Sequence, residues 1–542
     1  MSGLAVSPLD AGIVIGYFAF TVALGLWFGR RRIKTADSLF LADREATWPV
    51  IGASMFSANI SSQQFVGQAG LAYSIGLVAG AFQLVGALCF MLLAVFFVDV
   101  YLTLRLRTAP EFFERRYNSG ARLFVSGINI AMILSASIAT ALYAGATVLL
   151  DLLGDSVRVD FNVAVAVIAL AAGTYTVLGG LRSVLWTDLL QATLLLVGGA
   201  VTLVLSVQAA GGWAAVVDGD GGSRWSVVQP WDHVFGWFPL LTGAMILGVH
   251  GHCTDHDYVQ RALAARSVFH SKMGALLAAF LKILALFIIA APGVLAARLL
   301  PGLAHPDQAY AKLVTGVVPP GLAGLVLAGL LAAILGTVAA GLSAAASLVT
   351  YDFGGRLLPR LGEAARVRVG RLVMVALLVL CSALAPKIRS FPGVFAYLVQ
   401  VWSLLAPPVF VCVVFGVFTR SASARGANAT LVAGTALGAI AFWGIRDPTV
   451  STALPAYFLN PLNCGFVITI ACALVMLGFS RGASARPSPK DASAHPPIAR
   501  PHAGAMSRTE RRIYLASLTA LLVLWLAVIL IFSPWGPATT KT

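Results

Sequence analysis

Apolar runs about 20 residues long recur along the whole chain, and they constrain its fold more than any other feature. A helix of that length crosses the ~30 Å hydrocarbon layer of a bilayer, where only helices and closed barrels satisfy their backbone polar groups. About fourteen such windows can be placed. They lie at 10–29, 48–70, 75–104, 121–150, 161–180, 184–210, 234–255, 268–300, 321–352, 370–386, 393–418, 427–445, 463–480 and 513–533. The sequence therefore predicts an all-α, polytopic membrane protein.

Composition supports lipid as the main solvent. Charged residues make up 11% of the chain and apolar residues 59%, and the mean hydropathy is +0.87. Soluble domains carry about 25% charge and about 45–50% apolar residues. This composition excludes a cytosolic enzyme and a nucleic-acid-binding protein. The predicted spans contain no convincing nucleophile, metal set or acid pair, so we expect no enzyme activity.

Lys and Arg are unevenly distributed between the loops. If the N-terminus lies outside the cell, most of the 37 basic residues fall in the alternate, cytoplasmic loops. Membrane proteins retain Lys and Arg on that side. We expect a multi-pass protein of the cell (inner) membrane with both termini extracytoplasmic. The net charge of +15 then reports topology and requires no nucleic-acid partner.

Two spans contain polar interruptions. Most residues from Ser54 to Gln64 are Ser, Asn or Gln, which indicates either side chains bonded back to helix carbonyls or a discontinuous helix that can coordinate a cation. The stretch 248–257 contains His250, His252 and His256. These histidines could bind a metal, although their spacing matches no familiar zinc pattern. They could also hydrogen bond in a wet cavity, relay protons or face water.

The two interruptions lie five spans apart, in helices that cross in opposite directions. This arrangement predicts an inverted repeat, with a ten-helix core at 48–418 made of repeats at about 48–210 and 234–418. Residues 1–47 form the first helix and a cytoplasmic loop. Residues 419–542 add three helices, with a flexible cytoplasmic linker at 481–511.

The ninth span has small residues at every fourth position and hydroxyls beside them. The small residues are Gly324, Ala328, Ala332, Gly336, Ala340 and Ala344, and they predict close helix packing. Thr337 could add a hard oxygen ligand for a cation. Asp188 and Lys282 are ionisable residues within or near spans, where such groups are commonly functional. Snorkelling to the interface is the alternative for Lys282.

Several strings resemble the sodium/solute symporter family, in particular its sodium/glucose branch. They are Phe40–Arg44, Ile51–Ile60, Gln64–Gly67, Ala72–Gly76, Pro110–Phe112, Gly179–Leu181, Trp186–Gln191, Cys253–Asp255, Gln260–Ala265 and Ala278–Lys282. The resemblance runs from about residue 10 to about residue 430. It implies a LeuT-type five-plus-five inverted-repeat core, sodium-coupled uptake and alternating access.

The resemblance also implies site residues. The family's sodium site corresponds to Ser57, Ile60, Ala333, Gly336 and Thr337. Gly336 replaces one of two adjacent hydroxyl residues, which would weaken sodium binding. Asp188 matches an acidic residue at the sodium exit or at a second sodium site.

The solute site departs further from the family. Asn59, Gln64 and Lys282 match solute contacts of the family. The family's acidic contact in span three becomes Gln83, its Asn and Tyr in span seven become Gly248 and Gly251, and its Gln in span eleven becomes Val399, with Gln400 beside it. A hexose would lose a carboxylate contact and a stacking ring.

We therefore expect sodium-coupled symport of a small polar solute, most simply a sugar or polyol, with sodium, the solute and the bilayer as partners. Gly336 and the three histidines motivate an alternative, which is proton-coupled or sodium-independent transport. A membrane solute sensor on the same scaffold is the alternative from another class. It would normally carry a signalling domain, and the linker at 481–511 is too short to be one.

Overall fold

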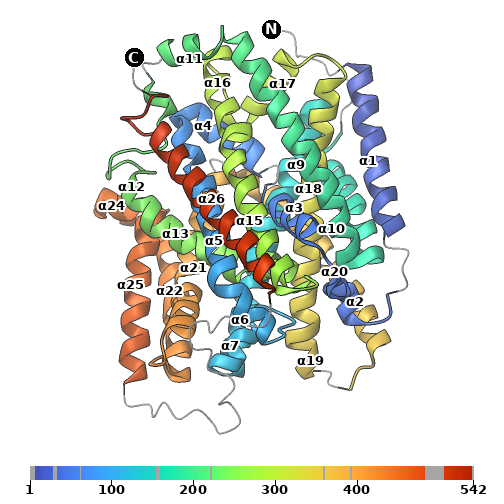
Figure 1. The fold of residues 1–542 in the computed structure, drawn as a ribbon, viewed down its shortest axis with the longest axis vertical. Coiled ribbons are helices and arrows are strands. Elements are labelled where there is room, and N and C mark those ends of the chain that lie inside the picture. Colours follow the sequence, from blue (N-terminus) through green and yellow to red (C-terminus); the bar gives the residue numbers. More distant parts are fainter. Residues whose placement is uncertain are drawn as a thin grey trace.

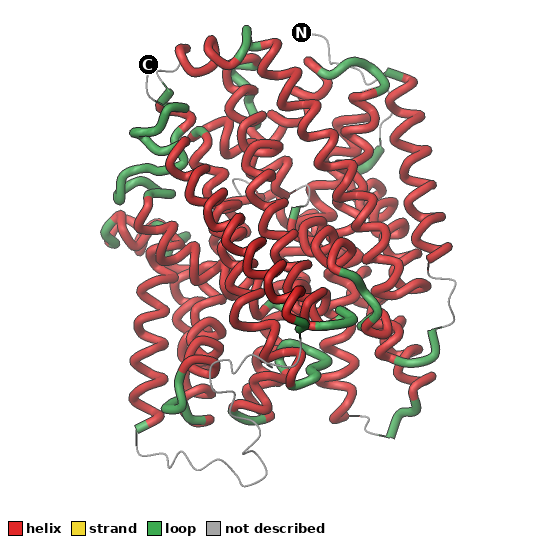
Figure 2. The backbone as a smooth tube through the Cα atoms, viewed as in Figure 1, coloured by secondary structure: helices red, strands yellow, loops and turns green. Residues whose placement is uncertain are grey.

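The computed structural model describes residues 7–28, 33–60, 63–153, 159–219, 222–357, 360–390, 394–481 and 506–539. Every secondary-structure element in these ranges is helical, apart from an isolated bridge between Ala46 and Ala265. Figures 1 and 2 show long helices standing side by side in one bundle. The predicted all-α class is confirmed.

Long helices and their continuations build the bundle. They are α1 (Pro8–Phe28), α3 (Trp48–Asn59), α4 (Ala69–Ile75), α5 (Ala81–Leu92), α6 (Val98–Thr103), α8 (Ser119–Met132), α9 (Ala139–Leu153), α10 (Phe161–Ala209), α13 (Met245–Val249), α14 (His256–Leu263), α15 (Val268–Ala285), α16 (Ala291–Leu299), α18 (Leu322–Leu348), α20 (Glu363–Leu384), α21 (Val394–Phe418), α22 (Ala424–Gly444), α25 (Pro461–Ser480) and α26 (Arg508–Ile531). Short helices lie between them. They are α2 (Ala36–Phe40), α7 (Glu111–Arg116), α11 (Trp213–Gly219), α12 (Trp237–Pro239), α17 (Ala309–Val317), α19 (Gly354–Leu357), α23 (Pro448–Ala453) and α24 (Ala456–Leu459).

In the described residues, 11 helical stretches are long and apolar enough to cross a membrane. Several contain a π-helical segment, such as 93–97 between α5 and α6 and 286–290 between α15 and α16. One stretch, α10, is 49 residues long and covers two of the predicted windows. Its backbone breaks at Gly180 (φ 62°, ψ −164°), where an added Cβ would lie 2.7 Å from the carbonyl oxygen of Leu39. Only glycine combines that backbone with so close an approach.

The window predicted at 48–70 is not a single long helix, because α3 ends at Asn59 and helical structure resumes in a π-helical segment at 63–68 that leads into α4. The pieces on either side of this break are too short to span a bilayer individually. The window predicted at 234–255 is helical from 237 to 254, through α12, α13 and two π-helical segments, and ends at the extended Asp255. The predicted interruptions at 54–64 and 248–257 therefore coincide with real breaks in helical structure.

Helix α18 lies at the centre of the bundle. It packs against α10, α1 and α20, and nearly all of its residues are buried. A Cβ on Gly324 would lie 2.6 Å from Cα of Asp10, and a Cβ on Gly341 would lie 2.7 Å from the Ile138 side chain. Gly324, a member of the predicted small-residue stripe, thus permits close packing, and Gly341 does the same outside that stripe. Helices α1 and α26 are mostly exposed and lie at the periphery.

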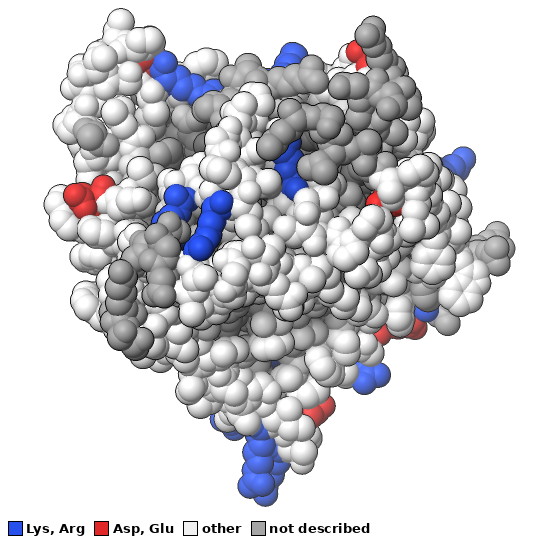
Figure 3. Space-filling model, turned by 90° about the horizontal axis from the view of Figure 1, so that it is seen from above, with Lys and Arg blue, Asp and Glu red and all other residues white. Residues whose placement is uncertain are grey.

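The two ends of the bundle differ. Both termini lie at one end, and α7 and α19 lie at the other (Figure 1). Seen from the end with the termini, the surface is mostly uncharged, with scattered Lys, Arg, Asp and Glu (Figure 3). The last helix begins at Arg508, inside the predicted linker, because Ser507 and Glu510 form a capping box there. Most of that linker, 482–505, lies outside the described residues.

Candidate functional site

Both interruptions end a helix inside the bundle. Helix α3 ends at Asn59, and Ile60 has a non-helical backbone (φ −87°, ψ 89°). Asp255 is extended (φ −65°, ψ 128°) between a π-helical segment and α14, and its side chain accepts a hydrogen bond from the backbone N–H of Asp257. Asp255 therefore acts as the N-cap of α14. The backbone groups freed at such breaks can serve ions and solutes.

A cavity lies between the broken helices and α5, α15, α18 and α21. Its lining includes most of the predicted solute residues and Thr337 from the predicted sodium site. The predicted residues on its wall are Asn59, Gln64, Gln83, Gly248, Lys282 and Val399. Sequence positions more than 300 residues apart thus meet at one site.

A chain of hydrogen bonds runs along the cavity wall. Lys282 Nζ donates to Gln83 Oε1 (2.8 Å), and Gln83 Nε2 donates to Gln64 Oε1 (3.1 Å). Gln64 Nε2 donates to Asn59 Oδ1 (3.2 Å), and Asn59 Nδ2 donates to Tyr258 Oη (2.8 Å). Side chains from α3, α5, α14, α15 and the segment after α3 are therefore held in fixed orientations. Such a network can present several donors and acceptors to a hydroxylated molecule.

Two predicted solute residues lie elsewhere. Gln400 accepts a hydrogen bond from Arg446 Nη2 (3.1 Å) and is not on the cavity wall. Gly251 is not among the lining residues either, but a Cβ placed on it would have Trp402 as its nearest neighbour, at 3.8 Å. The Trp402 ring, from α21, therefore lies beside Gly251, the position at which the family has a tyrosine according to the resemblance.

The cavity lining also includes polar and aromatic residues that were not predicted as solute contacts, among them Gln68, His252, Tyr258 and Trp402. His252 Nδ1 donates to the carbonyl oxygen of Gly248 (2.8 Å), and the His252 ring stacks on Tyr258 with centroids 5.4 Å apart. Tyr258 and Trp402 carry no local signal in the sequence, because ordinary aromatic residues in apolar segments are common. Only the fold brings them to the cavity.

The predicted sodium residues lie where α3 meets α18 and α10. Thr337 Oγ1 donates to the carbonyl oxygen of Ala333 (3.1 Å), and Ser57 Oγ donates to Gln191 Oε1 (3.4 Å). A Cβ on Gly336 would collide with Gln191 Oε1 and lie 3.0 Å from Asp188 Oδ1. The space left by the missing side chain at Gly336 is therefore occupied by two oxygens from α10.

Asp188 belongs to a buried charged cluster. Its Oδ2 accepts from Ser54 Oγ (2.5 Å) and lies 3.4 Å from Arg261 Nη2. Arg261 is fully buried and also pairs with Asp257 Oδ1 (2.9 Å). Asp188 Oδ1 has no hydrogen-bond partner among the residues that the structure describes. An oxygen without a donor, beside the Gln191 oxygen, is chemically suited to a hard cation.

Gln191 and Arg261 were missed as site residues. Gln191 lies three positions after Asp188 on one helix, and residues at that spacing share a face. Because Asp188 was recognised in the sequence, its spacing to Gln191 could have identified Gln191 as a site residue. Arg261 stands in a quoted family string, and its pair with Asp257 follows from their i,i+4 spacing on α14, but its pair with Asp188 depends on how α14 packs against α10.

The three histidines do not converge. His250 Nδ1 lies 2.8 Å from Thr254 Oγ1, and His252 is bonded to Gly248. His256 Nε2 lies 2.6 Å from Ser347 Oγ, and its Nδ1 accepts from the backbone N–H of Ala109 (3.2 Å). No group of three potential metal ligands occurs within the described part of the chain. His250 and His252 bond within their own helical run, and only His256 joins other segments, through Ser347 and Ala109.

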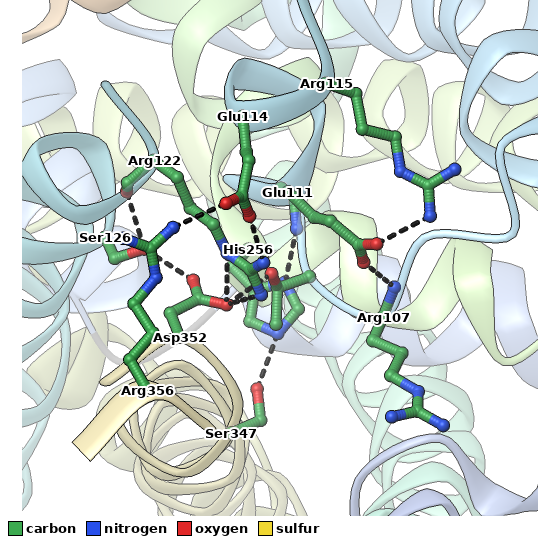
Figure 4. A network of polar contacts seen from close by, with 12 residues as sticks. Arg107, Glu111, Glu114, Arg115, Arg122, Ser126, His256, Ser347, Asp352 and Arg356 are labelled. Carbon is green, nitrogen blue, oxygen red and sulfur yellow. Dashed lines mark hydrogen bonds and ion pairs between the residues drawn. The ribbon is translucent and has the colours of Figure 1, made fainter. Parts of the chain in front are cut away.

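His256 belongs to a polar network (Figure 4) that includes residues of α7 and α19, which lie at the bundle end opposite the termini (Figure 1). At its centre Asp352 accepts from Arg122 Nη2 (2.5 Å), Ser126 Oγ (2.5 Å) and Thr108 Oγ1 (2.8 Å). Arg122 also pairs with Glu114, as Figure 4 shows. The network ties the segment after α6 to α8 and to the segment that follows α18.

Comparison with known proteins assigns the chain to a family. The model of the sodium:solute symporter family matches residues 39–434. Sodium/myo-inositol cotransporter 2 of Mus musculus is 30% identical over 476 residues, covering 80% of this chain and 70% of that protein. The sodium/glucose cotransporter of Vibrio parahaemolyticus is 29% identical over 459 residues, covering 79% of this chain and 84% of that protein.

Solved structures share the fold. The outward-open, substrate-bound state of a Na⁺-coupled sialic acid symporter matches with a TM-score of 0.72 at 20% identity, over 88% of this chain and 98% of that one. Solved neighbours are transporters of the LeuT-type fold. Eleven candidate spans make the protein a multi-pass membrane protein. Because the family model covers most of its length, the chain belongs to the sodium:solute symporter family.

Proposed function

We propose that the protein takes up a small hydroxylated solute together with sodium by alternating access. The observation that carries this proposal is the enclosed polar wall from Lys282 through Gln83, Gln64 and Asn59 to Tyr258, placed where two broken helices meet. Relatives named as myo-inositol and glucose cotransporters favour a polyol or sugar. Since those relatives are transporters, we expect no enzymatic step.

Sodium is proposed to bind between α3, α10 and α18. The ligands would be Asp188 Oδ1, Gln191 Oε1 and the Ser57 hydroxyl, with freed carbonyls at the end of α3. The remaining sodium ligands would be backbone or hydroxyl oxygens of Ile60, Ala333 and Thr337. In this arrangement the α10 oxygens compensate for the hydroxyl that Gly336 lacks.

The proposed topology has about fourteen crossings with both termini extracytoplasmic. Helix α10 would contribute two crossings, separated at Gly180, and each broken span would contribute one. Residues 48–418 would form a five-plus-five inverted-repeat core in the cell membrane, preceded by one helix and followed by three. The network around Asp352 would then be the cytoplasmic closure.

Coupling follows from linked binding. If sodium binds the outward-open state more tightly than the inward-open state, it raises the population that accepts solute. The sodium residues and the solute wall share the end of α3, where Ser57 and Asn59 are two positions apart. Ordering of that segment by sodium would orient Asn59 toward Gln64 and thereby favour solute binding.

Reconstituted protein tests this function. With an inward sodium gradient, proteoliposomes should accumulate radiolabelled sugar, polyol or sugar acid, and replacement of sodium by choline should abolish accumulation. Equal uptake in choline would refute sodium coupling. Sodium-independent uptake driven by external acid would instead indicate the proton-coupled alternative, and binding without uptake would indicate a sensor.

A further inference from the structure

We infer that the solute carries a carboxylate as well as hydroxyls, as a uronate or another sugar acid does; this inference rests on the proposed function. It follows from the charge of the cavity wall. Lys282 is 3% exposed, and the hydrogen bond that the structure gives its ammonium group goes to the neutral Gln83 amide. The lining residues include neither Asp nor Glu.

A buried ammonium group without a counter-charge is unfavourable, because the interior does not replace its hydration. Neighbouring acids on the described elements are already engaged. Asp188 and Asp257 face Arg261, and Asp255 caps α14. Asp99 pairs with Lys272 (2.7 Å). A carboxylate brought by the solute would supply the missing negative charge and form a charge-assisted hydrogen bond.

His252 borders the same space as the ammonium group and calls for a hydroxyl of the solute in addition to the carboxylate. Lys282 Nζ and His252 Nε2 each lie 3.2 Å from the position that a Cβ on Gly86 would take, so both atoms border one small space. His252 donates through Nδ1 to Gly248, which leaves Nε2 with a free lone pair. That nitrogen has no partner in the described residues. A lone pair accepts from a hydroxyl and repels a carboxylate.

Trp402 adds a donor. Its indole Nε1–H has no hydrogen-bond partner in the described part of the chain, and Trp402 lies on the cavity wall. A solute that satisfies all three groups presents a carboxylate to Lys282, a hydroxyl proton to His252 and an oxygen to Trp402. Sugar acids combine these features on one small ring.

Paired probes test the inference without any variant. Binding of D-glucuronate and D-glucose, and of D-galacturonate and D-galactose, is measured by calorimetry on the full chain in sodium. Members of each pair differ at one carbon, where a carboxylate replaces a hydroxymethyl group. The uronate is expected to bind about tenfold to a hundredfold more tightly in at least one pair. Equal or tighter binding of the neutral member in every pair that binds, or no uronate binding, would overturn the inference.

A charge change at Gln83 tests whether the missing counter-charge of Lys282 is the reason for carboxylate binding. Gln83→Glu places a carboxylate on the oxygen position that already contacts Lys282, so uronate binding is expected to fall about tenfold or more, while the ratio shifts toward the neutral sugar. Gln400→Glu is the matched control, because Gln400 bonds to Arg446 away from the cavity wall. Equal losses in the two variants would contradict a local effect at Lys282.

The sodium dependence separates this inference from the proposed function. Sodium-dependent uptake of a neutral sugar without uronate binding would overturn the carboxylate inference and leave symport standing. Uronate binding that is equally tight in choline and in sodium would support the carboxylate inference and refute sodium coupling. Tight, sodium-dependent uronate binding supports both.

Discussion

Restoring a hydroxyl at Gly336 is expected to weaken sodium binding, although the resemblance to the family suggests the reverse. The Cβ of Gly336→Ser would lie 3.0 Å from Asp188 Oδ1 and would collide with Gln191 Oε1. Both oxygens belong to buried side chains of α10, which packs tightly on α18. Overpacking of this kind costs about 1–3 kcal/mol. If the same shift displaces two sodium ligands, apparent sodium affinity falls about 5- to 150-fold.

The assay measures how the apparent melting temperature and the initial uptake rate depend on sodium concentration. Gly336→Ala is the matched comparison, since it adds the same Cβ without an oxygen. We expect both variants to require more sodium, by similar factors, with solute affinity at saturating sodium nearly unchanged. Tighter sodium binding by Gly336→Ser than by the natural protein would refute the idea that α10 oxygens fill this space.

Three further perturbations probe separate parts of the site. Asp188→Asn removes a proposed ligand charge and should abolish sodium-dependent thermal stabilisation while solute-free protein still folds; retained sodium dependence would exclude Asp188 as a ligand. Tyr258→Phe removes the acceptor of the Asn59 hydrogen bond, worth about 1 kcal/mol, so solute affinity measured by calorimetry should fall about fivefold. Asp352→Asn weakens the pairing with Arg122, and a cysteine placed at Ala109 should then react faster with a water-soluble maleimide. An unchanged rate would contradict a closing role for the network.

The sequence was most informative about features that the lipid environment determines, which are helix formation and the cost of polar residues inside a span. Apolar windows predicted the helical class, and polar residues inside apolar windows predicted both helix breaks. Helix α10 shows the limit, because the windows at 161–180 and 184–210 meet at the Gly180 kink, but hydropathy does not reveal that the two helices join there without a loop.

Side-chain partnerships depend on tertiary packing, which periodicity does not encode. Asp188 was recognised as an acid in a span, yet its pairing with Arg261 requires α10 and α14 to meet. Trp402 was indistinguishable from other aromatic residues of an apolar segment until α21 placed it beside Gly251. Gln400 shows the opposite error, because it was predicted as a solute contact but lies off the cavity wall. Its neighbour Val399 lines the cavity, and Gln400 bonds to Arg446.

Tolerance to new side chains differs sharply between the helical segments around this cavity. On α18, glycines such as Gly324 and Gly341 have neighbouring atoms within 3 Å of an added Cβ, so enlargement there disturbs the scaffold. At Gly251 the nearest atom, on Trp402, would lie 3.8 Å away, which is ordinary van der Waals contact. Changes of solute preference are therefore more accessible to evolution or engineering at Gly251 than at the crowded glycines of α18.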